Sequence, residues 1–237
     1  MDNSAQVAGL KQKIDQYSPS DATIELVKNT PILLLVGVSG AGKGSIQERL
    51  LETDGYHSIV SHTTRKPREN DGVMEQNGRE YHFIDLAEAE KMLDDGAFVE
   101  AKFYSGNVYG TSAAEIQRSH DEHRIAMTDI EVQGIAEYEA IKPDIMAVYV
   151  VPPSYELWQE RLRKRYDGRV DAADLERRMK TAKLELQEAL SKPYYRFVIN
   201  DDLTEAAKIV DAIAHGSDTK NDEAAKNLAH DLLAKLQ

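Results

Sequence analysis

A glycine-rich turn is the first stretch of this sequence whose residue types could do chemistry. Residues 37–45 read GVSGAGKGS and follow an apolar run that ends at Val36. Glycines let a backbone turn so that consecutive N–H groups point into one concavity, where the N-terminus of a following helix adds a positive dipole. Lys43 can then reach the terminal phosphates of a nucleotide, and its spacing from Gly37 and Gly42 is that of a phosphate-binding loop.

The turn departs from the usual pattern at one place. Gly44 follows the lysine, and the hydroxyl comes one residue later, at Ser45. A plain glycine-rich connection between a strand and a helix is the alternative interpretation. We favour nucleotide binding because a strand, a lysine, a hydroxyl and a helix coincide in this stretch.

The charge distribution indicates a small anionic ligand. The 237-residue chain carries 29 Lys and Arg against 41 Asp and Glu, a formal net charge of -12. Such a chain repels nucleic acids and anionic membranes unless its basic residues are concentrated. They are partly concentrated, in RKPR at 65–68 and RLRKRYDGR at 161–169, with Arg177 and Arg178 beyond. We therefore expect no nucleic-acid polymer and no membrane among the partners.

The composition is typical of a soluble globular protein, with 41% hydrophobic and 30% charged residues. No apolar run approaches the roughly 20 residues that span a bilayer, and the polar N-terminus has no signal-peptide core. The chain has no cysteine, so it can form neither a disulfide framework nor a thiolate metal site. We therefore expect a cytoplasmic protein.

The elements that must position these residues alternate between short apolar runs and stretches of helical period. Strands that alternate with crossover helices predict a parallel sheet covered on both faces. Strands are expected at 32–37, 58–61, 125–130, 146–151 and 197–200, and helices at 45–52, 132–141, 155–165, 174–189 and 204–214.

Three segments lie outside this alternation. Residues 61–111 are richer in glycine, tyrosine and turn signals and predict a small α+β insertion, with a helix at 86–94 and a strand at 98–103. The two ends, 1–30 and 217–237, have helical periods. We expect them to pack on each other or on the sheet, and a dimer contact is the alternative.

Several motifs after the turn, read in order, resemble the guanylate kinase family. They are SHTTRKPR (61–68), NGREYHF (77–83), GAFVEAKFYSGNVYGT (96–111), DIEVQG (129–134), PPS (152–154), RLRKR (161–165), RRMKTAKLEL (177–186) and NDDL (200–203). The resemblance runs from residue 31 to residue 215 without a break. It implies an α/β fold, namely a P-loop three-layer α/β/α core with a parallel sheet, an inserted α+β GMP-binding domain and a helical lid.

The resemblance also implies domain limits and a reaction. The reaction is transfer of the γ-phosphoryl group of ATP to GMP, and to dGMP, giving ADP and GDP with Mg²⁺ as cofactor; the protein would act as a monomer or a homodimer. The limits are helical extensions at 1–30 and 216–237, core segments at 31–60, 112–163 and 182–215, a GMP-binding domain at 61–111 and a lid at 164–181. ATP would contact Gly37, Ser39, Gly40, Ala41, Gly42, Lys43, Gly44 and Ser45.

The acceptor contacts carried over from the family make chemical sense in this sequence. Arginine guanidinium forks match the oxygens of a phosphate dianion in pairs, and a phenol hydroxyl adds a neutral donor. The expected contacts to the GMP phosphate are Arg65, Arg68, Tyr81 and Tyr109, and those to guanine are Ser61, Glu100, Thr111 and Glu131.

Glu100 is the residue expected to select guanine. Guanine presents N1–H and N2–H₂ side by side, and one carboxylate can accept both hydrogen bonds. Adenine offers an acceptor at N1, which would face the carboxylate's lone pairs. A buried polar group left unpaired costs about 1–3 kcal/mol, so Glu100 should discriminate strongly against AMP.

The transfer step needs positive charge around the γ-phosphoryl oxygens. By resemblance Arg165 and Arg178 are the lid arginines, and with Lys43 and Asp129 they are the expected catalytic residues. Ser45 and Asp129 would hold Mg²⁺, directly or through water, and Asp129 could instead orient Lys43. For Arg161 and Arg163 we expect pairing with acidic neighbours on a solvated helix.

Several positions depart from the family pattern: Val38 stands for proline, Ala101 for tryptophan and Glu131 for aspartate, and the stretch 69–78 is longer than usual. Two alternatives therefore stay open. One is a non-catalytic binding module of guanylate kinase type, and the other is a related kinase of a different phosphorylated acceptor. The pairs His57/His62 and His120/His123 are interpreted as structural.

Overall fold

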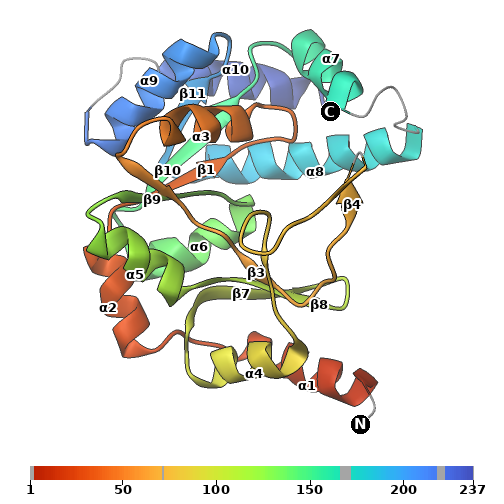
Figure 1. Cartoon of the computed structure of the whole chain (residues 1–237). Coiled ribbons are helices and arrows are strands. Elements are labelled where there is room, and N and C mark those ends of the chain that lie inside the picture. Colours follow the sequence, from red (N-terminus) through yellow and green to blue (C-terminus); the bar gives the residue numbers. More distant parts are fainter. Residues whose placement is uncertain (1–2, 71, 166–171, 218–221, 237) are drawn as a thin grey trace. The chain divides into compact units, whose positions relative to one another are not determined.

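The computed structural model describes residues 3–70, 72–165, 172–217 and 222–236. Figure 1 shows the elements in chain order. The described chain forms two compact units. The first unit comprises Met1–Pro31, His57–Ala126 and Glu137–Pro143, and the second comprises Ile32–Tyr56, Met127–Ala136 and Asp144–Gln237. The domain limits expected from the family remain a prediction.

Parallel strands form the centre of the second unit. Strands β1 (Ile32–Val36), β10 (Met146–Val151) and β11 (Tyr195–Ile199) pair in parallel. The whole sheet has the order β11-β10-β1-β9-β2, with β9 at Ile125–Asp129 and β2 at Tyr56–Ser58. All five residues of β1 are buried, as expected for a strand covered on both faces. The predicted parallel sheet is confirmed.

The strand predicted at 58–61 is wrong, because β2 already ends at Ser58. The N–H of Val60 donates to Oε2 of Glu115 at 2.9 Å. That backbone group is therefore satisfied by a side chain, and the strand does not continue through it.

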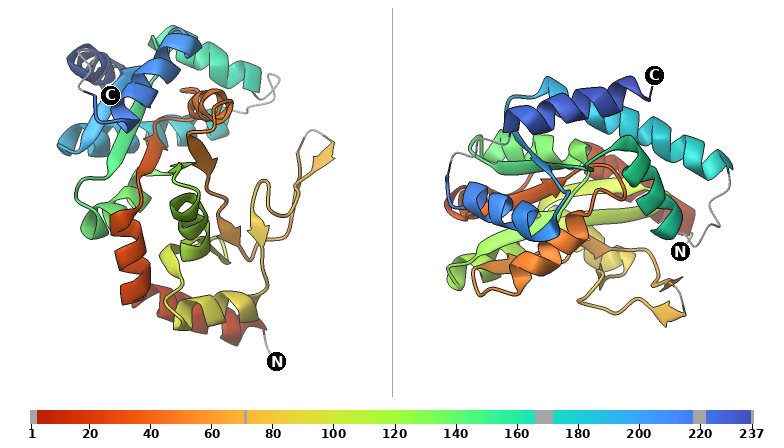
Figure 2. Two further views of the ribbon diagram at one scale, coloured as in Figure 1. Left: turned by 60° about the vertical axis from the view of Figure 1, so that its left-hand side comes forward. Right: turned by 90° about the horizontal axis from the view of Figure 1, so that it is seen from above.

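Helices cover both faces of this sheet. Helix α3 (Lys43–Leu51) packs with α9 (Leu203–Ala214), and α8 (Ala172–Ser191) packs with α10 (Asp222–Ala234). Figure 2 shows the two pairs on opposite sides of β10 and β11. Helix α9 begins where Asp202 caps it, since its side chain accepts from the N–H of Glu205. The three-layer arrangement expected for the core is present in this unit.

The C-terminal segment packs on its own unit. Helix α10 contacts α8, β10 and β11 and buries Ala225, Ala229 and Leu232. At its first residue, Oδ1 of Asp222 accepts the N–H of Phe197. The expectation that this segment packs on the sheet is confirmed.

The first unit contains a four-stranded sheet of order β6-β3-β8-β7. The strands are β3 (His62–Thr63), β6 (His82–Phe83), β7 (Phe98–Tyr104) and β8 (Asn107–Ser112). The long stretch after Arg68 forms a hairpin of two short strands, β4 (Glu69–Asn70) and β5 (Val73–Met74). The predicted α+β character of this segment is therefore confirmed.

Four helices belong to the first unit. They are α1 (Asn3–Asp15), α2 (Asp21–Asn29), α4 (Leu86–Asp94) and α5 (Ala113–Asp121). Helix α1 packs on α4 and β7, and α2 packs on α5 and β7. The N-terminal segment is thus part of this unit's packing, against its sheet. Among the described residues no helix is long and apolar enough to cross a membrane.

Two further helices belong to the remaining connections. Helix α6 (Val132–Ile141) follows β9, and α7 (Tyr155–Arg165) follows β10. Both occupy the ranges predicted from the sequence. Residues 166–171, which include part of the expected lid, lie outside the described residues.

Candidate active site

The glycine-rich turn connects β1 to α3 in the second unit, and its glycines are needed for its shape. Gly42 has φ 95° and forms the N-cap of α3. A Cβ at Gly42 would lie 2.1 Å from Nδ2 of Asn200, and a Cβ at Gly37 would lie 2.4 Å from the Val150 carbonyl oxygen. Positive φ and this close approach both exclude a larger side chain.

Two side chains from other elements hold the turn in place. The indole Nε1–H of Trp158 donates to the Ser39 carbonyl at 2.7 Å, and Nδ2 of Asn200 donates to the Ala41 carbonyl at 2.8 Å. Both residues are buried. Sequence reasoning assigned them no role. The single tryptophan of the chain and an asparagine at the end of a predicted strand were the available signals.

The turn borders a cavity of about 550 Å³ that fits a nucleotide's phosphates. Nζ of Lys43 donates to the Gly37 carbonyl at 2.5 Å. A phosphate could replace that carbonyl as the acceptor. The lining residues are Gly40, Gly42, Lys43, Gly44, Ser45, Glu48, Asp129, Arg161, Asn200, Asp201 and Leu203.

The donor set of this cavity fits Mg²⁺. Ser45 and Asp129 line it as expected, and Glu48 adds a carboxylate. Mg²⁺ prefers oxygen ligands and is usually held by one or two carboxylates together with substrate phosphates. No cluster of three or more His, Cys, Asp or Glu side chains that could hold a metal occurs among the described residues.

Arg161 lines the cavity, and its expected pairing with acidic neighbours remains a prediction, because residues 166–171 lie outside the described residues. Its Nη2 donates to the Asn200 carbonyl at 3.1 Å. Its Nη1 is buried and has no hydrogen-bond partner among the described residues. Arg163, by contrast, is exposed and donates to Gln159 one turn away, at 3.4 Å.

Of the two expected lid arginines, Arg178 is half-exposed on α8, and Arg165 is the last residue of α7. The side chain of Arg165 lies outside the described residues. Sequence reasoning missed Glu185, another charged residue of α8. Burial raises the pKa of its carboxyl to about 7, with Lys43 acting in the opposite direction and Glu131 adding to the rise. Glu131 itself is exposed and belongs to the second unit.

In the first unit, Arg65 is buried beside the two tyrosines expected to bind phosphate. Its Cζ lies 5.2 Å from the centroid of the Tyr81 ring, and the rings of Tyr81 and Tyr109 meet edge to face at 6.0 Å. Hydrogen bonds to Glu75 and, secondarily, to Tyr109 raise the pKa of the Arg65 guanidinium. The structure therefore brings three of the four predicted phosphate contacts together.

Glu75 is the partner that the sequence did not reveal. Its carboxylate accepts two hydrogen bonds from Arg65, from Nη1 at 2.8 Å and from Nη2 at 3.0 Å. It also accepts from the backbone N–H of Arg68 at 2.8 Å, while the Arg68 side chain is exposed. This is a bidentate, charge-assisted pair that fixes the guanidinium plane. A carboxylate seven residues after an arginine pair was the available signal.

Glu100 and Thr111 lie opposite each other on β7 and β8. Oε1 of Glu100 accepts the backbone N–H of Thr111 at 3.0 Å, and Glu100 is only 9% exposed. Burial raises the pKa of the Glu100 carboxyl to about 7, opposed by the hydrogen bonds to Thr111. Ser61 stands just before β3, half-buried, and its carbonyl accepts the N–H of His82 at 2.9 Å.

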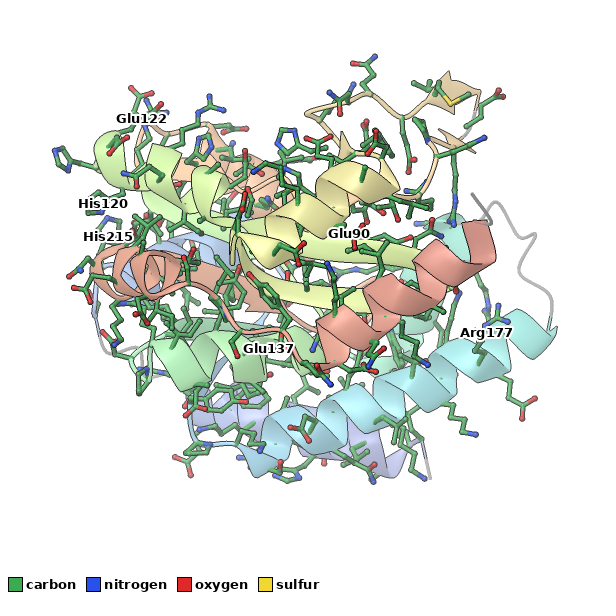
Figure 3. All side chains as sticks on the ribbon, turned by 90° about the horizontal axis from the view of Figure 1, so that it is seen from below. Glu90, His120, Glu122, Glu137, Arg177 and His215 are labelled. Atoms are coloured by element: carbon green, nitrogen blue, oxygen red, sulfur yellow. The ribbon has the colours of Figure 1, made fainter. Side chains whose placement is uncertain are left out.

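Two residues of α6 interact electrostatically with the Glu100 carboxyl. Glu137, labelled in Figure 3, forms an ion pair with Lys102 and raises the pKa of Glu100 further. Tyr138 is fully buried, and burial together with the charge of Glu100 raises the pKa of its phenol. Neither residue had been singled out, because helix α6 is distant in sequence from β7.

Two of the four histidines expected to be structural, His62 and His120, make side-chain contacts. His62 stacks on His82 with 4.6 Å between ring centroids, and Nε2 of His82 lies 3.0 Å from Oε1 of Glu115. Nδ1 of His120 lies 3.3 Å from Oγ1 of Thr30. These contacts tie β3 to β6 and α2 to α5.

This chain is similar to known guanylate kinases in sequence and in structure. The family model for guanylate kinase matches residues 28–216. A guanylate kinase of Schizosaccharomyces pombe is 34% identical over 202 residues, which cover 84% of this chain and 96% of that protein. One of Bdellovibrio bacteriovorus is 36% identical over 173 residues, which cover 73% and 89%.

A solved structure has the same fold. The crystal structure of guanylate kinase from Anaplasma phagocytophilum matches with a TM-score of 0.57, covering 80% of this chain and 87% of that chain. The sequence identity is 23%, so this likeness shows the fold alone.

Proposed function

This chain belongs to the guanylate kinase family, and on that premise we propose how its own residues carry the reaction. The reaction is transfer of the γ-phosphoryl group of ATP to GMP, which makes the protein a nucleoside monophosphate kinase. The observation that carries the assignment of the acceptor is the buried carboxyl of Glu100, held by the backbone N–H of Thr111.

On the donor side, the phosphates of ATP occupy the cavity beside the glycine-rich turn. Lys43 exchanges the Gly37 carbonyl for phosphate oxygens. The buried Nη1 of Arg161 has no hydrogen-bond partner within the described part of the chain, and it finds its acceptor there. Arg165 and Arg178 supply further charge at the transferring group.

Ser45 and Asp129 would hold Mg²⁺ together with the ATP phosphates, directly or through water. A bound ion would supply positive charge against the phosphate oxygens during transfer. The chain's own contribution is to present two oxygen groups in the lining of the cavity that Lys43 also lines.

On the acceptor side, Arg65, Arg68, Tyr81 and Tyr109 bind the GMP phosphate. Glu75 keeps the Arg65 fork in one orientation before GMP arrives, so little side-chain entropy is lost on binding. Phosphoryl transfer gains most of its rate from such positioning of the two substrates.

The guanine base is read by Glu100, with Ser61, Thr111 and Glu131 as further contacts. The two donors on the guanine edge stabilise the ionised carboxylate, whose pKa is otherwise raised by burial. AMP presents an acceptor at the same place and leaves the charge uncompensated. dGMP differs only at the ribose and is accepted as well.

The deciding experiment is a coupled assay of ADP release with GMP, dGMP, AMP, CMP and UMP. We expect turnover with GMP alone among the ribonucleotides. Tight GMP binding without turnover would support a binding module instead, and turnover of a different phosphorylated acceptor would support a related kinase. In the same assay Lys43→Met should abolish transfer while GMP still binds.

A further inference from the structure

The edge of β7 beside Glu100 is closed by a residue of the N-terminal segment. Strand β7 is last in the order β6-β3-β8-β7, so the described sheet has no strand on its outer side. The hydroxyl of Tyr17 donates to the Phe98 carbonyl at 2.6 Å and accepts the Phe98 N–H at 2.8 Å. One side chain thus satisfies both polar groups that an edge residue leaves unpaired.

The same place carries an irregularity of the strand pairing. Phe98 lies opposite Ser112, but the next pair along β7 is Glu100 opposite Thr111, so Val99 is an extra residue. Such a bulge bends the strand and redirects the side chains that follow it. Glu100 is the first residue after this bulge. The direction of the Glu100 side chain therefore depends on the position of the bulge at Val99.

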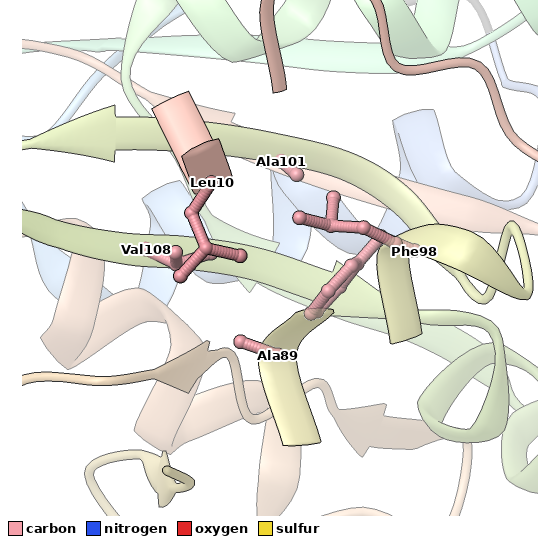
Figure 4. Close-up of a cluster of buried hydrophobic side chains, with 6 residues drawn as sticks. Leu10, Ala89, Phe98, Ala101 and Val108 are labelled. Atoms are coloured by element: carbon pink, nitrogen blue, oxygen red, sulfur yellow. The ribbon is translucent and has the colours of Figure 1, made fainter. Parts of the chain in front are cut away.

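Apolar packing between α1 and β7 adds to the contact that Tyr17 makes with Phe98. Leu10 is 1% exposed and belongs to one buried cluster with Phe98, Ala101 and Val108, which Figure 4 shows around the Leu10 side chain. The ring of Tyr17 also meets the ring of Phe98 edge to face, with centroids 6.4 Å apart. These contacts lie on both sides of Glu100 along β7.

Hydrogen bonds from the N-terminal segment hold Gly96, shortly before β7 begins. The Ser20 N–H donates to the Gly96 carbonyl at 3.0 Å, and the Thr23 hydroxyl donates to the same oxygen at 2.9 Å. A Cβ at Gly96 would lie 2.6 Å from the Ser20 nitrogen, so the two backbones are in close contact. The segment before residue 28 therefore contacts the chain just before β7 as well as β7 itself.

We propose that Tyr17, presented by the N-terminal segment 3–27, is a positioning residue for guanine recognition. This inference rests on the proposed function, because it assigns Tyr17 a role through Glu100. The segment lies outside the region 28–216 that the family model matches. Without the hydroxyl, the Phe98 N–H and carbonyl lose their partner, the bulge shifts, and Glu100 no longer meets the guanine edge squarely.

The test compares Tyr17→Phe with Tyr56→Phe in the full-length protein. Tyr56 is a matched control, because its hydroxyl donates to Oδ1 of Asp211 at 2.6 Å within the second unit. Tyr17→Phe should raise the KM for GMP by about tenfold and lower the preference for GMP over AMP, since one well-placed hydrogen bond is worth about that factor. The KM for ATP should stay within about twofold of the wild type. Tyr56→Phe should change neither selectivity nor the KM for GMP.

A double-mutant cycle separates positioning from mere packing. In a Glu100→Gln background, Tyr17→Phe should have less than about a twofold further effect on the KM for GMP, because the residue it positions is already altered. Leu10→Ala should act in the same direction as Tyr17→Phe, with the hydroxyl intact. Equal changes in the KM for GMP and for ATP, or full additivity with Glu100→Gln, would overturn the inference.

The outcomes also separate this inference from the function it rests on. A wild-type protein that releases no ADP with GMP refutes the proposed function. A wild-type protein that is active and selective, and whose selectivity Tyr17→Phe leaves unchanged, refutes only the role of Tyr17.

Discussion

The binding of GMP should depend on pH through the buried carboxyl of Glu100. Burial raises its pKa to about 7 from the usual 4.5, so a large share of the ligand-free protein carries a neutral Glu100 at neutral pH. Guanine offers two donors and therefore binds the ionised form. Binding of GMP should pull the carboxyl pKa down and release a proton.

The size of the effect follows from that pKa. The apparent dissociation constant is the intrinsic one divided by the ionised fraction. Between pH 8 and pH 6 the ionised fraction falls about tenfold for a group that titrates near 7, so the affinity for GMP should fall about tenfold. AMP should behave in the opposite way, because a protonated carboxyl can donate to adenine N1. Selectivity for GMP over AMP is thus highest above pH 7.

Calorimetry of GMP binding across this range, in two buffers of different ionisation enthalpy, measures both the affinity and the protons released. The phosphate of GMP titrates in the same region, so Glu100→Gln serves as the control that keeps the phosphate and removes the carboxyl. Between pH 8 and pH 6 the GMP affinity of the wild type should fall about tenfold more than that of Glu100→Gln. Parallel curves for the two proteins would refute the assignment of Glu100 as the reader of guanine.

Three further outcomes are expected. Glu75→Gln removes one charge from the bidentate pair with Arg65. In steady-state kinetics it should raise the KM for GMP several-fold and leave the KM for ATP unchanged. The exposed control Glu69→Gln should change neither KM. Gly42→Ala places a Cβ 2.1 Å from Nδ2 of Asn200, at a residue with φ 95°. It should weaken ATP binding at least about tenfold, while GMP binding is retained. Normal ATP affinity would contradict the close contact between Gly42 and Asn200. Glu100→Gln should stabilise the ligand-free protein by about 3 kcal/mol above pH 7, because a carboxyl whose pKa rises from 4.5 to about 7 on folding opposes folding once it is ionised. That gain should disappear below pH 4.5, and thermal unfolding at both pH values measures it.

Local patterns in the sequence were sufficient for most of the elements. The ranges predicted for α4, α6 and α7 agree with the structure, and the alternation of apolar runs and helical stretches predicted the parallel sheet. These features depend on residue periodicity and on turn residues, which act over a few positions. The strand predicted at 58–61 failed because a side chain of α5 takes the Val60 N–H, which no local pattern reveals.

The sequence by itself also determined which chemistry is available. The turn with Lys43, the order of the motifs after it, and a carboxyl at position 100 are properties of residue type and spacing. They predict a phosphate-binding loop and a candidate reader of guanine. The physical reason is that a glycine turn and a short motif position their own atoms.

Tertiary structure alone decided the partners of those residues. Asn200 reaches the turn at Ala41 across 159 positions, and Tyr17 reaches Phe98 across 81. Buried polar groups must find partners wherever the folded chain brings donors and acceptors together. Such pairing depends on the whole packing, so the supports behind the phosphate loop and behind Glu100 became visible only in the fold.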